Sequence, residues 1–170
     1  GKVIVYNPKL VTPAPTSYKD CFDPKYGNKL GFIDIQYQFV MLAAGLAAAG
    51  DMTALEKGKE LLLAAKRGGA RIYPTNEAFA QALKTEEISI GMMWKARAVQ
   101  WQNAGIAVEA AAPSEGTMAY VSGFMIPKNA PNKAGAYAYM DAMLEKGAQE
   151  NFAVDMGFGP TVTNAVVAPD

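Results

Sequence analysis

Short apolar runs alternate with longer amphipathic segments along most of the chain. The short runs are rich in Val, Ile and aromatic residues and are closed by turn-forming residues, a pattern typical of strands. A strand closed by Asn-Pro opens the chain, for example, and another ends just before Asp34. The segments predicted to be strands or extended chain are 3–6, 30–33, 71–73, 88–92, 106–111 and 117–126.

The intervening segments carry apolar residues at helical spacing, such as Phe79 and Leu83. Residues that can cap a first helical turn precede several of them, and glycines follow several of their ends. The expected N-caps are Thr16-Ser17, Asp34, Asp51, Asn76 and Asn132. The predicted helices are a single turn at 18–22 and longer segments at 35–49, 52–67, 77–84, 95–103, 133–145 and 148–156.

Alternation of strands and helices predicts the α/β class, with a mixed sheet flanked by helices. The strand at 88–92 carries Trp94 to its C-terminal end, and the next extended run contains Tyr120 and Ser122. Ligands of open α/β sheets bind outside the carboxyl ends of the strands. We therefore expect Trp94 and Tyr120 to line a cleft for a small molecule.

The charge balance removes one class of function. Sixteen basic and sixteen acidic residues give a formal net charge of zero, and no basic run is interleaved with aromatic residues. Nucleic acid is therefore not an expected partner, because its binding depends on a basic surface.

The chain contains no histidine, which removes Ser-His and Cys-His nucleophile pairs and most zinc sites. The single cysteine, Cys21, cannot form an internal disulfide and is expected to be a half-buried apolar residue rather than a reactive thiol. Met92 and Met93 are interpreted as core residues. We expect no catalytic residues, no metal and no cofactor.

The longest run of low charge, 39–50, is shorter than the roughly 20 apolar residues that span a bilayer, and suits a buried helix instead. No signal peptide is visible before the strand at 3–6. A processed protein would look the same, so this absence does not fix the location.

A series of motifs resembles the second lobe of periplasmic solute-binding proteins of ABC transporters, in particular the spermidine/putrescine-receptor-like group. Pro15-Thr16-Ser17-Tyr18-Lys19-Asp20 and the following Phe22-Asp23-Pro24 resemble its P-T-S-W-x-D-L-W-D-P segment. Glu87-Ile88-Ser89-Ile90-Gly91-Met92-Met93-Trp94 is similar to its G-E-V-x-x-G-M-x-W motif. Two further matches are Pro113-Ser114-Glu115-Gly116, similar to P-K-E-G, and Gly157-Phe158 with Asn164, similar to G-Y-x-x-x-N.

The resemblance implies one lobe of a type II periplasmic-binding-protein-like fold, in which two α/β lobes close on a ligand. Most of the first lobe would precede Gly1, and closing helices would follow Asp170. The expected organisation is a second-lobe domain at 1–116, a crossing strand and helix at 117–146, and a return segment at 147–170. Such a fragment would expose apolar surface and could self-associate.

The resemblance also suggests which residues meet the ligand. Trp94 and Tyr120 match aromatic residues of the cleft, and Phe158 stands where a Tyr is usual. Ile35, Gln38 and Ser122 occupy positions that are acidic in polyamine receptors. A simple polyamine is therefore not the expected ligand, because an unpaired ammonium in a closed cleft costs several kcal/mol. A monocation or a hydroxyl-rich neutral solute fits better, held by Asp34, Gln36 and Gln38.

Alternatives remain open at this stage. Asp34 could serve only as a helix cap, and Lys95 and Arg97 could either be solvated or meet an anionic group of the ligand. The main hypothesis is a non-enzymatic receptor, periplasmic or membrane-tethered outside the cytoplasm, that delivers its solute to a membrane permease. The competing hypotheses are an enzyme of the same fold acting on a small metabolite and an interaction domain without a ligand.

Overall fold

The computed structural model of the chain describes residues 1–168. The chain divides into two compact units, Gly1–Ala119 (unit 1) and Tyr120–Asp170 (unit 2). The candidate ligand residues at Asp34, Gln36, Gln38 and Trp94 belong to unit 1.

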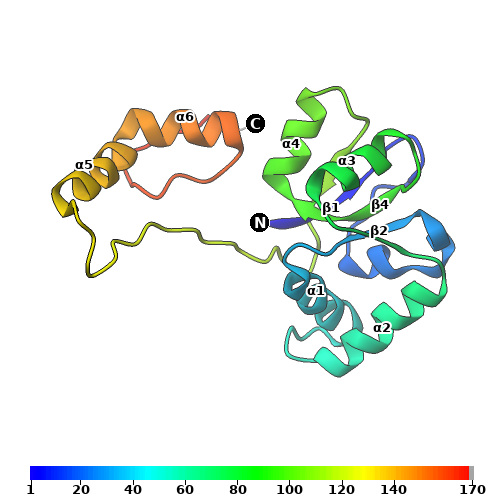
Figure 1. Ribbon diagram of the computed structural model, residues 1–170. Coiled ribbons are helices and arrows are strands. Elements are labelled where there is room, and N and C mark those ends of the chain that lie inside the picture. Colours follow the sequence, from blue (N-terminus) through cyan, green and yellow to red (C-terminus); the bar gives the residue numbers. More distant parts are fainter. Residues whose placement is uncertain (169–170) are drawn as a thin grey trace. The chain divides into compact units, whose positions relative to one another are not determined.

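Unit 1 is built on a five-stranded mixed sheet with the strand order β3-β2-β4-β1-β5 (Figure 1). Strand β2 runs parallel to both β3 and β4, whereas β1 is antiparallel to β4 and β5. The mixed sheet flanked by helices predicted from the sequence is thus confirmed. The strands are β1 (Lys2–Tyr6), β2 (Leu30–Ile33), β3 (Arg71–Tyr73), β4 (Ile90–Trp94) and β5 (Glu109–Ala111).

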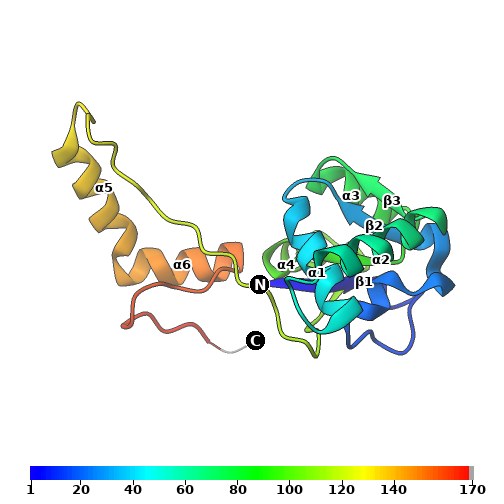
Figure 2. The ribbon, with the colours of Figure 1, turned by 90° about the horizontal axis from the view of Figure 1, so that it is seen from below.

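Helices cover both faces of this sheet (Figures 1 and 2), with α1 and α2 on one face and α3 and α4 on the other. Two 3₁₀ segments, η1 and η2, follow one another directly ahead of β2. The helical elements of unit 1 are η1 (Tyr18–Phe22), η2 (Pro24–Lys29), α1 (Tyr37–Ala49), α2 (Leu55–Arg67), α3 (Asn76–Lys84) and α4 (Lys95–Asn103).

Successive side chains of the strands pack alternately into two hydrophobic cores, one on each face of the sheet. Ile4 and Tyr6 of β1 pack on the α1 side, and Val3 and Val5 pack on the α3 and α4 side. This is the period-two alternation of a strand that is covered on both faces. By the same alternation Lys2 falls on the face of Ile4, so a charged residue lies at the end of an otherwise apolar row.

Helices α1 and α2 approach each other closely through glycines. A Cβ atom added to Gly58 of α2 would lie 2.7 Å from the backbone nitrogen of Gly45 in α1. Contacts this short do not occur between real side chains and backbone, so the crossing needs glycine at position 58.

The helix starts differ from the predicted ones at four places, one of them α6, which begins at Lys146 instead of residue 148. Helix α1 begins after Gln36, so Asp34 is not its N-cap, although the Asp34 carbonyl accepts a bond from the Tyr37 N–H. Helix α2 begins after Ala54, because Asp51 instead accepts bonds from the backbone and hydroxyl of Thr53.

The third helix is capped one residue earlier than predicted. The hydroxyl of Thr75 accepts a bond from the Ala78 N–H, and Asn76 is the first helical residue. Both Asp51 and Asn76 therefore carry the right side-chain chemistry for a cap but do not occupy the capping position.

The extended prediction for 117–126 is only partly confirmed. This segment contains no strand, and its one bridge pairs Met118 with Lys2. The Lys2 N–H donates to the Met118 carbonyl over 3.0 Å. The chain thus enters and leaves unit 1 at neighbouring positions.

Unit 2 contains two consecutive helices, α5 (Lys133–Leu144) and α6 (Lys146–Met156), which change direction at Glu145 (Figure 2). The side chain of Asn132 caps α5 as predicted, and Gly157 ends α6 in a left-handed conformation. Among residues 120–168 only Ala153 is buried.

Candidate ligand-binding site

Trp94 is the last residue of β4 and the N-cap of α4. Its side chain is partly buried, and its ring meets the Phe39 ring edge to face, with 4.9 Å between centroids and 80° between planes. Phe39 lies in the first turn of α1, which is the helix that follows β2. Trp94 is therefore held between the carboxyl end of β4 and the amino end of α1.

The loop after β2 reaches the same edge of the sheet. Because β2 and β4 are parallel neighbours, with Leu30 opposite Ile90, their carboxyl ends lie side by side. Residues 34–36 leave β2 at this edge. This is the edge where an open α/β sheet binds its ligands, so the structure brings Gln36 and Trp94 to the same edge.

Gln36 has two unusual features. Its backbone is in the left-handed region, with φ 57° and ψ 43°, which is uncommon for a residue other than glycine. Its Oε1 atom is buried and has no hydrogen-bond partner within residues 1–168. Strained backbone and an unsatisfied buried acceptor are features that concentrate at functional sites.

Lys2 supplies the complementary donor. It lies directly opposite Trp94 in the antiparallel pairing of β1 with β4, and its Nζ atom is 4.8 Å from the centroid of the Trp94 ring. Its side chain is fully buried, and Nζ has no hydrogen-bond partner in the described part of the chain. Burial lowers the pKa of Lys2 from 10.5 to about 8.

These two atoms, Lys2 Nζ and Gln36 Oε1, are the buried side-chain polar atoms without partners among the described residues. Leaving such atoms unsatisfied costs about 1–3 kcal/mol each, and more for a charged group. Both atoms belong to segments at the carboxyl edge of β2 and β4. Sequence reasoning overlooked Lys2, although its place in the alternation with Ile4 and Tyr6 was a usable signal.

Asp34 and Gln38 are exposed. Asp34 lines a groove of about 280 Å³ between α1, α2 and β3, together with Tyr37 and ten further residues. Apolar side chains such as Leu62 and Ile72 make most of its surface, and Lys59 and Lys66 are its two basic residues. The groove contains neither Trp94 nor Gln36, so the structure assigns Asp34 to a different surface feature.

Tyr120, Ser122 and Phe158 belong to unit 2 and are exposed. Tyr120 and Ser122 lie in the segment without regular secondary structure, and Phe158 packs on Phe152 with 5.5 Å between ring centroids. Their joint role with Trp94 stays a prediction.

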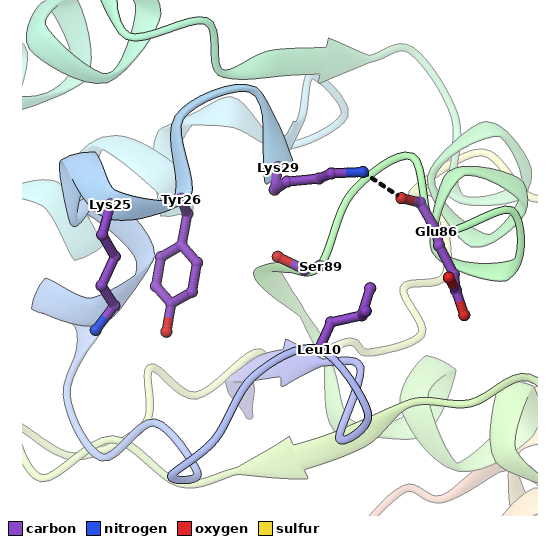
Figure 3. A pocket seen from close by; sticks show the side chains of 6 residues that line it. All are labelled: Leu10, Lys25, Tyr26, Lys29, Glu86 and Ser89. Carbon is purple, nitrogen blue, oxygen red and sulfur yellow. Dashed lines mark hydrogen bonds between the residues drawn. The ribbon is translucent and has the colours of Figure 1, made fainter.

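A second cavity, of about 260 Å³, lies at the opposite edge of the sheet (Figure 3). Lys29 and Ser89 directly precede β2 and β4, and the ammonium of Lys29 donates to the Glu86 carbonyl over 2.8 Å. Lys25, on the other side, pairs with Asp23 at 3.1 Å. Because its cations are already paired and it lies at the amino ends of the parallel strands, this cavity is the weaker candidate.

The remaining features concern a reactive thiol, a metal site and a membrane-spanning helix. Cys21 is fully buried and not half-buried as predicted, and burial raises the pKa of its thiol well above the usual value, which fits an inert core residue. Among residues 1–168, no cluster of three His, Cys, Asp or Glu residues could hold a metal ion. Nor does any helix in that range have the length and apolar character needed to cross a membrane.

Comparison with known proteins identifies the family. The family described as "Bacterial extracellular solute-binding protein" matches residues 1–170. The chain belongs to this family. The resemblance inferred from the motifs is thereby confirmed.

Similar proteins support the assignment. The spermidine/putrescine-binding periplasmic protein of Salmonella typhimurium is 28% identical over 158 residues, which cover 89% of this chain and 43% of the relative. The chain thus spans less than half the length of that relative.

Solved structures show the same fold. The TpPotD lipoprotein of Treponema pallidum matches with a TM-score of 0.79 and 17% identity, covering 93% of this chain and 51% of that one. Iron-bound HitA of Pseudomonas aeruginosa matches with a TM-score of 0.76 and 20% identity, covering 99% and 56%.

Proposed function

We propose that the protein is the extracytoplasmic solute-binding component of an ABC importer. In this role it captures a small polar or amine-containing solute in a cleft and presents it to a membrane permease. The family assignment supports this role, and the named relative binds spermidine or putrescine. No chemical step is required, because receptors of this kind work by shifting a population towards a closed, ligand-bound state.

The observation that carries the proposal is the arrangement around Trp94. An aromatic ring at the carboxyl end of β4 provides a flat apolar contact, and the buried polar atoms of Lys2 and Gln36 nearby lack partners. Small-molecule sites combine a mostly apolar lining with a few oriented polar groups. Tyr120, Ser122 and Phe158 of unit 2 are proposed as further ligand residues on the strength of the motif resemblance.

The solute is proposed not to be a simple polyamine. Ile35, Gln38 and Ser122 stand where the resemblance leads us to expect acidic residues. The likeness to iron-bound HitA shows that neighbours of this fold bind chemically unrelated ligands, so the fold alone does not select a polyamine.

A thermal-shift screen of the full-length protein against amines, opines, sugars and amino acids tests the proposal. A specific solute should raise the unfolding midpoint, because a ligand that binds only the folded state stabilises it. Trp94→Ala should remove that shift, whereas Trp101→Ala, which alters a core tryptophan instead, should lower the midpoint but keep the shift. The proposal fails if no solute of the panel moves the midpoint, or if the protein converts the solute into a product.

A further inference from the structure

The environment of Lys2 narrows the chemistry of the ligand. Its ammonium is fully buried, and the contact that the structure gives it is the face of the Trp94 ring. A ring face compensates a buried cation less completely than a hydrogen-bonded anion does. The ammonium therefore retains unused capacity to bind an anionic group.

Two helix starts at this edge of the sheet add partial positive charge. Helix α4 begins at Lys95 beside Trp94, has no acidic residue in its first turn, and lacks a side-chain cap bond. Helix α1 shares these two properties at its own start. The amino ends of both helices carry partial positive charge at the edge where Trp94 lies.

Among residues 1–168, no group forms a hydrogen bond with the Lys2 ammonium. The hydroxyl of Tyr18 donates to the Lys2 backbone carbonyl over 2.8 Å and leaves Nζ untouched. Lys95 is a further basic residue at the start of α4, and Asp34, the nearest acidic residue along the β2–α1 loop, is exposed on the apolar groove.

We propose that Lys2 binds an oxyanion of the ligand, so that the solute is a zwitterion or an anion rather than a polycation. This inference rests on the proposed function and adds the charge of the ligand to it. The carboxylate or similar group replaces the Trp94 ring as the main partner of the ammonium, which requires the partly buried ring to turn aside. The Gln36 Oε1 acceptor is then available for a donor elsewhere on the same solute.

Three probes of equal length separate the possibilities: putrescine, 4-amino-1-butanol and 4-aminobutanoate differ at one end as cation, neutral group and anion. Calorimetric titration of the full-length protein should give 4-aminobutanoate an affinity at least tenfold above the other two. Lys2→Met should abolish that preference, since a charge-assisted hydrogen bond is worth about a tenfold change or more. The binding of 4-amino-1-butanol should stay within about twofold.

Two controls keep the result interpretable. Lys95→Met removes the same formal charge from the same region and should leave the preference in place. Lys2→Met is expected to fold at least as well as the unaltered protein, because replacing a buried charge with an apolar side chain of similar shape is often neutral or stabilising.

The outcomes separate the two proposals. If no solute of the broad panel binds, the receptor function itself fails. If the best solute of that panel carries no oxyanion, if putrescine binds as tightly as 4-aminobutanoate, or if the carboxylate preference survives Lys2→Met, the assignment of Lys2 is overturned while the receptor function stands. If Lys95→Met lost the carboxylate preference to the same extent, the assignment of Lys2 would also be overturned. The preference would then come from the general positive potential of the region and not from a contact with Lys2.

Discussion

Lys2 and Trp94 face each other across β1 and β4, with the ammonium 4.8 Å from the centre of the indole ring. The pKa of Lys2 is lowered from 10.5 to about 8 by burial. Between these values the unfolded chain binds more protons than the folded one, so stability rises with pH. We expect the free energy of unfolding to increase by about 3 kcal/mol across the whole interval.

Chemical denaturation of the unaltered protein and Lys2→Met between pH 7.5 and 9.5 measures this effect. Tyr6, Tyr18 and Tyr73, with pKa values raised to about 12, and Cys21 lower stability as pH rises further, but they are present in both proteins. The difference between the two curves of unfolding free energy against pH therefore gives the contribution of Lys2 alone. If the two curves ran parallel, the Lys2 ammonium could not be buried without a hydrogen-bonded or charged partner.

The contact between Phe39 and Trp94 should be energetically coupled. Edge-to-face aromatic pairs contribute about 0.5–1.5 kcal/mol beyond the area they bury. A double-mutant cycle with Phe39→Leu and Trp94→Leu should give a coupling free energy in this range. Additive effects would indicate that the rings are neighbours without a specific interaction.

Glu115 should stabilise the fold by joining the segment after β5 to the start of η1 through hydrogen bonds. It accepts bonds from the Ser17 hydroxyl at 2.5 Å and the Tyr18 N–H at 3.3 Å, and these bonds help to lower the pKa of its carboxyl although burial opposes them. A lowered carboxyl pKa gives stability that is present above the unfolded value and lost as pH falls through the folded value.

Glu115→Gln should therefore reduce the free energy of unfolding by about 1 kcal/mol at pH 7, and the difference should disappear as pH falls through the lowered pKa of Glu115. Glu56→Gln is the matched control, since Glu56 is exposed and pairs only with Lys59 at 3.8 Å. An equal effect in both variants would contradict the proposed role of Glu115.

The close approach of α1 and α2 at Gly58 predicts that a Gly→Ala substitution there destabilises the protein, whereas the same substitution at an open glycine does not. Gly58→Ala places a methyl group against the Gly45 backbone and should destabilise unit 1 by about 1–3 kcal/mol. Gly147→Ala, in the open first turn of α6, has no atom within 4 Å of the new methyl and should be neutral or stabilising. Thermal unfolding of the two variants gives the comparison.

Cys21 should be chemically silent in the folded protein. Its side chain is fully buried and its pKa is raised by burial, so almost no thiolate is available at neutral pH. We expect labelling by iodoacetamide only after addition of denaturant. Rapid labelling of the native protein would reopen the possibility of thiol chemistry.

Sequence patterns predicted the sheet and most helix ends because these depend on local alternation and on residues that break helices. They placed four helix starts wrongly. Asp34, Asp51 and Asn76 each have the local chemistry of a cap, but Gln36, Ala54 and Thr75 occupy the capping positions, and α6 begins at Lys146 instead of residue 148. The expectation that Trp94 and Gln36 meet a ligand came from the family resemblance, whereas their place at one edge of the sheet follows from the adjacency of β2 and β4 in the structure. The burial of Lys2 was not predicted, since a lysine at a strand end is ordinarily solvated.

The pairing of Lys2 with Met118 also has a mechanical consequence. The backbone enters unit 1 at one of these residues and leaves at the other, and a hydrogen bond joins them. A pulling force applied to the two ends of unit 1 would therefore act first on the hydrogen bond between Lys2 and Met118. The inner strands of the sheet would bear the force only after that bond had broken. Lys2 lies beside Trp94 and Met118 belongs to the hydrophobic core on the α1 side, so the same event would disturb the candidate ligand site together with that core.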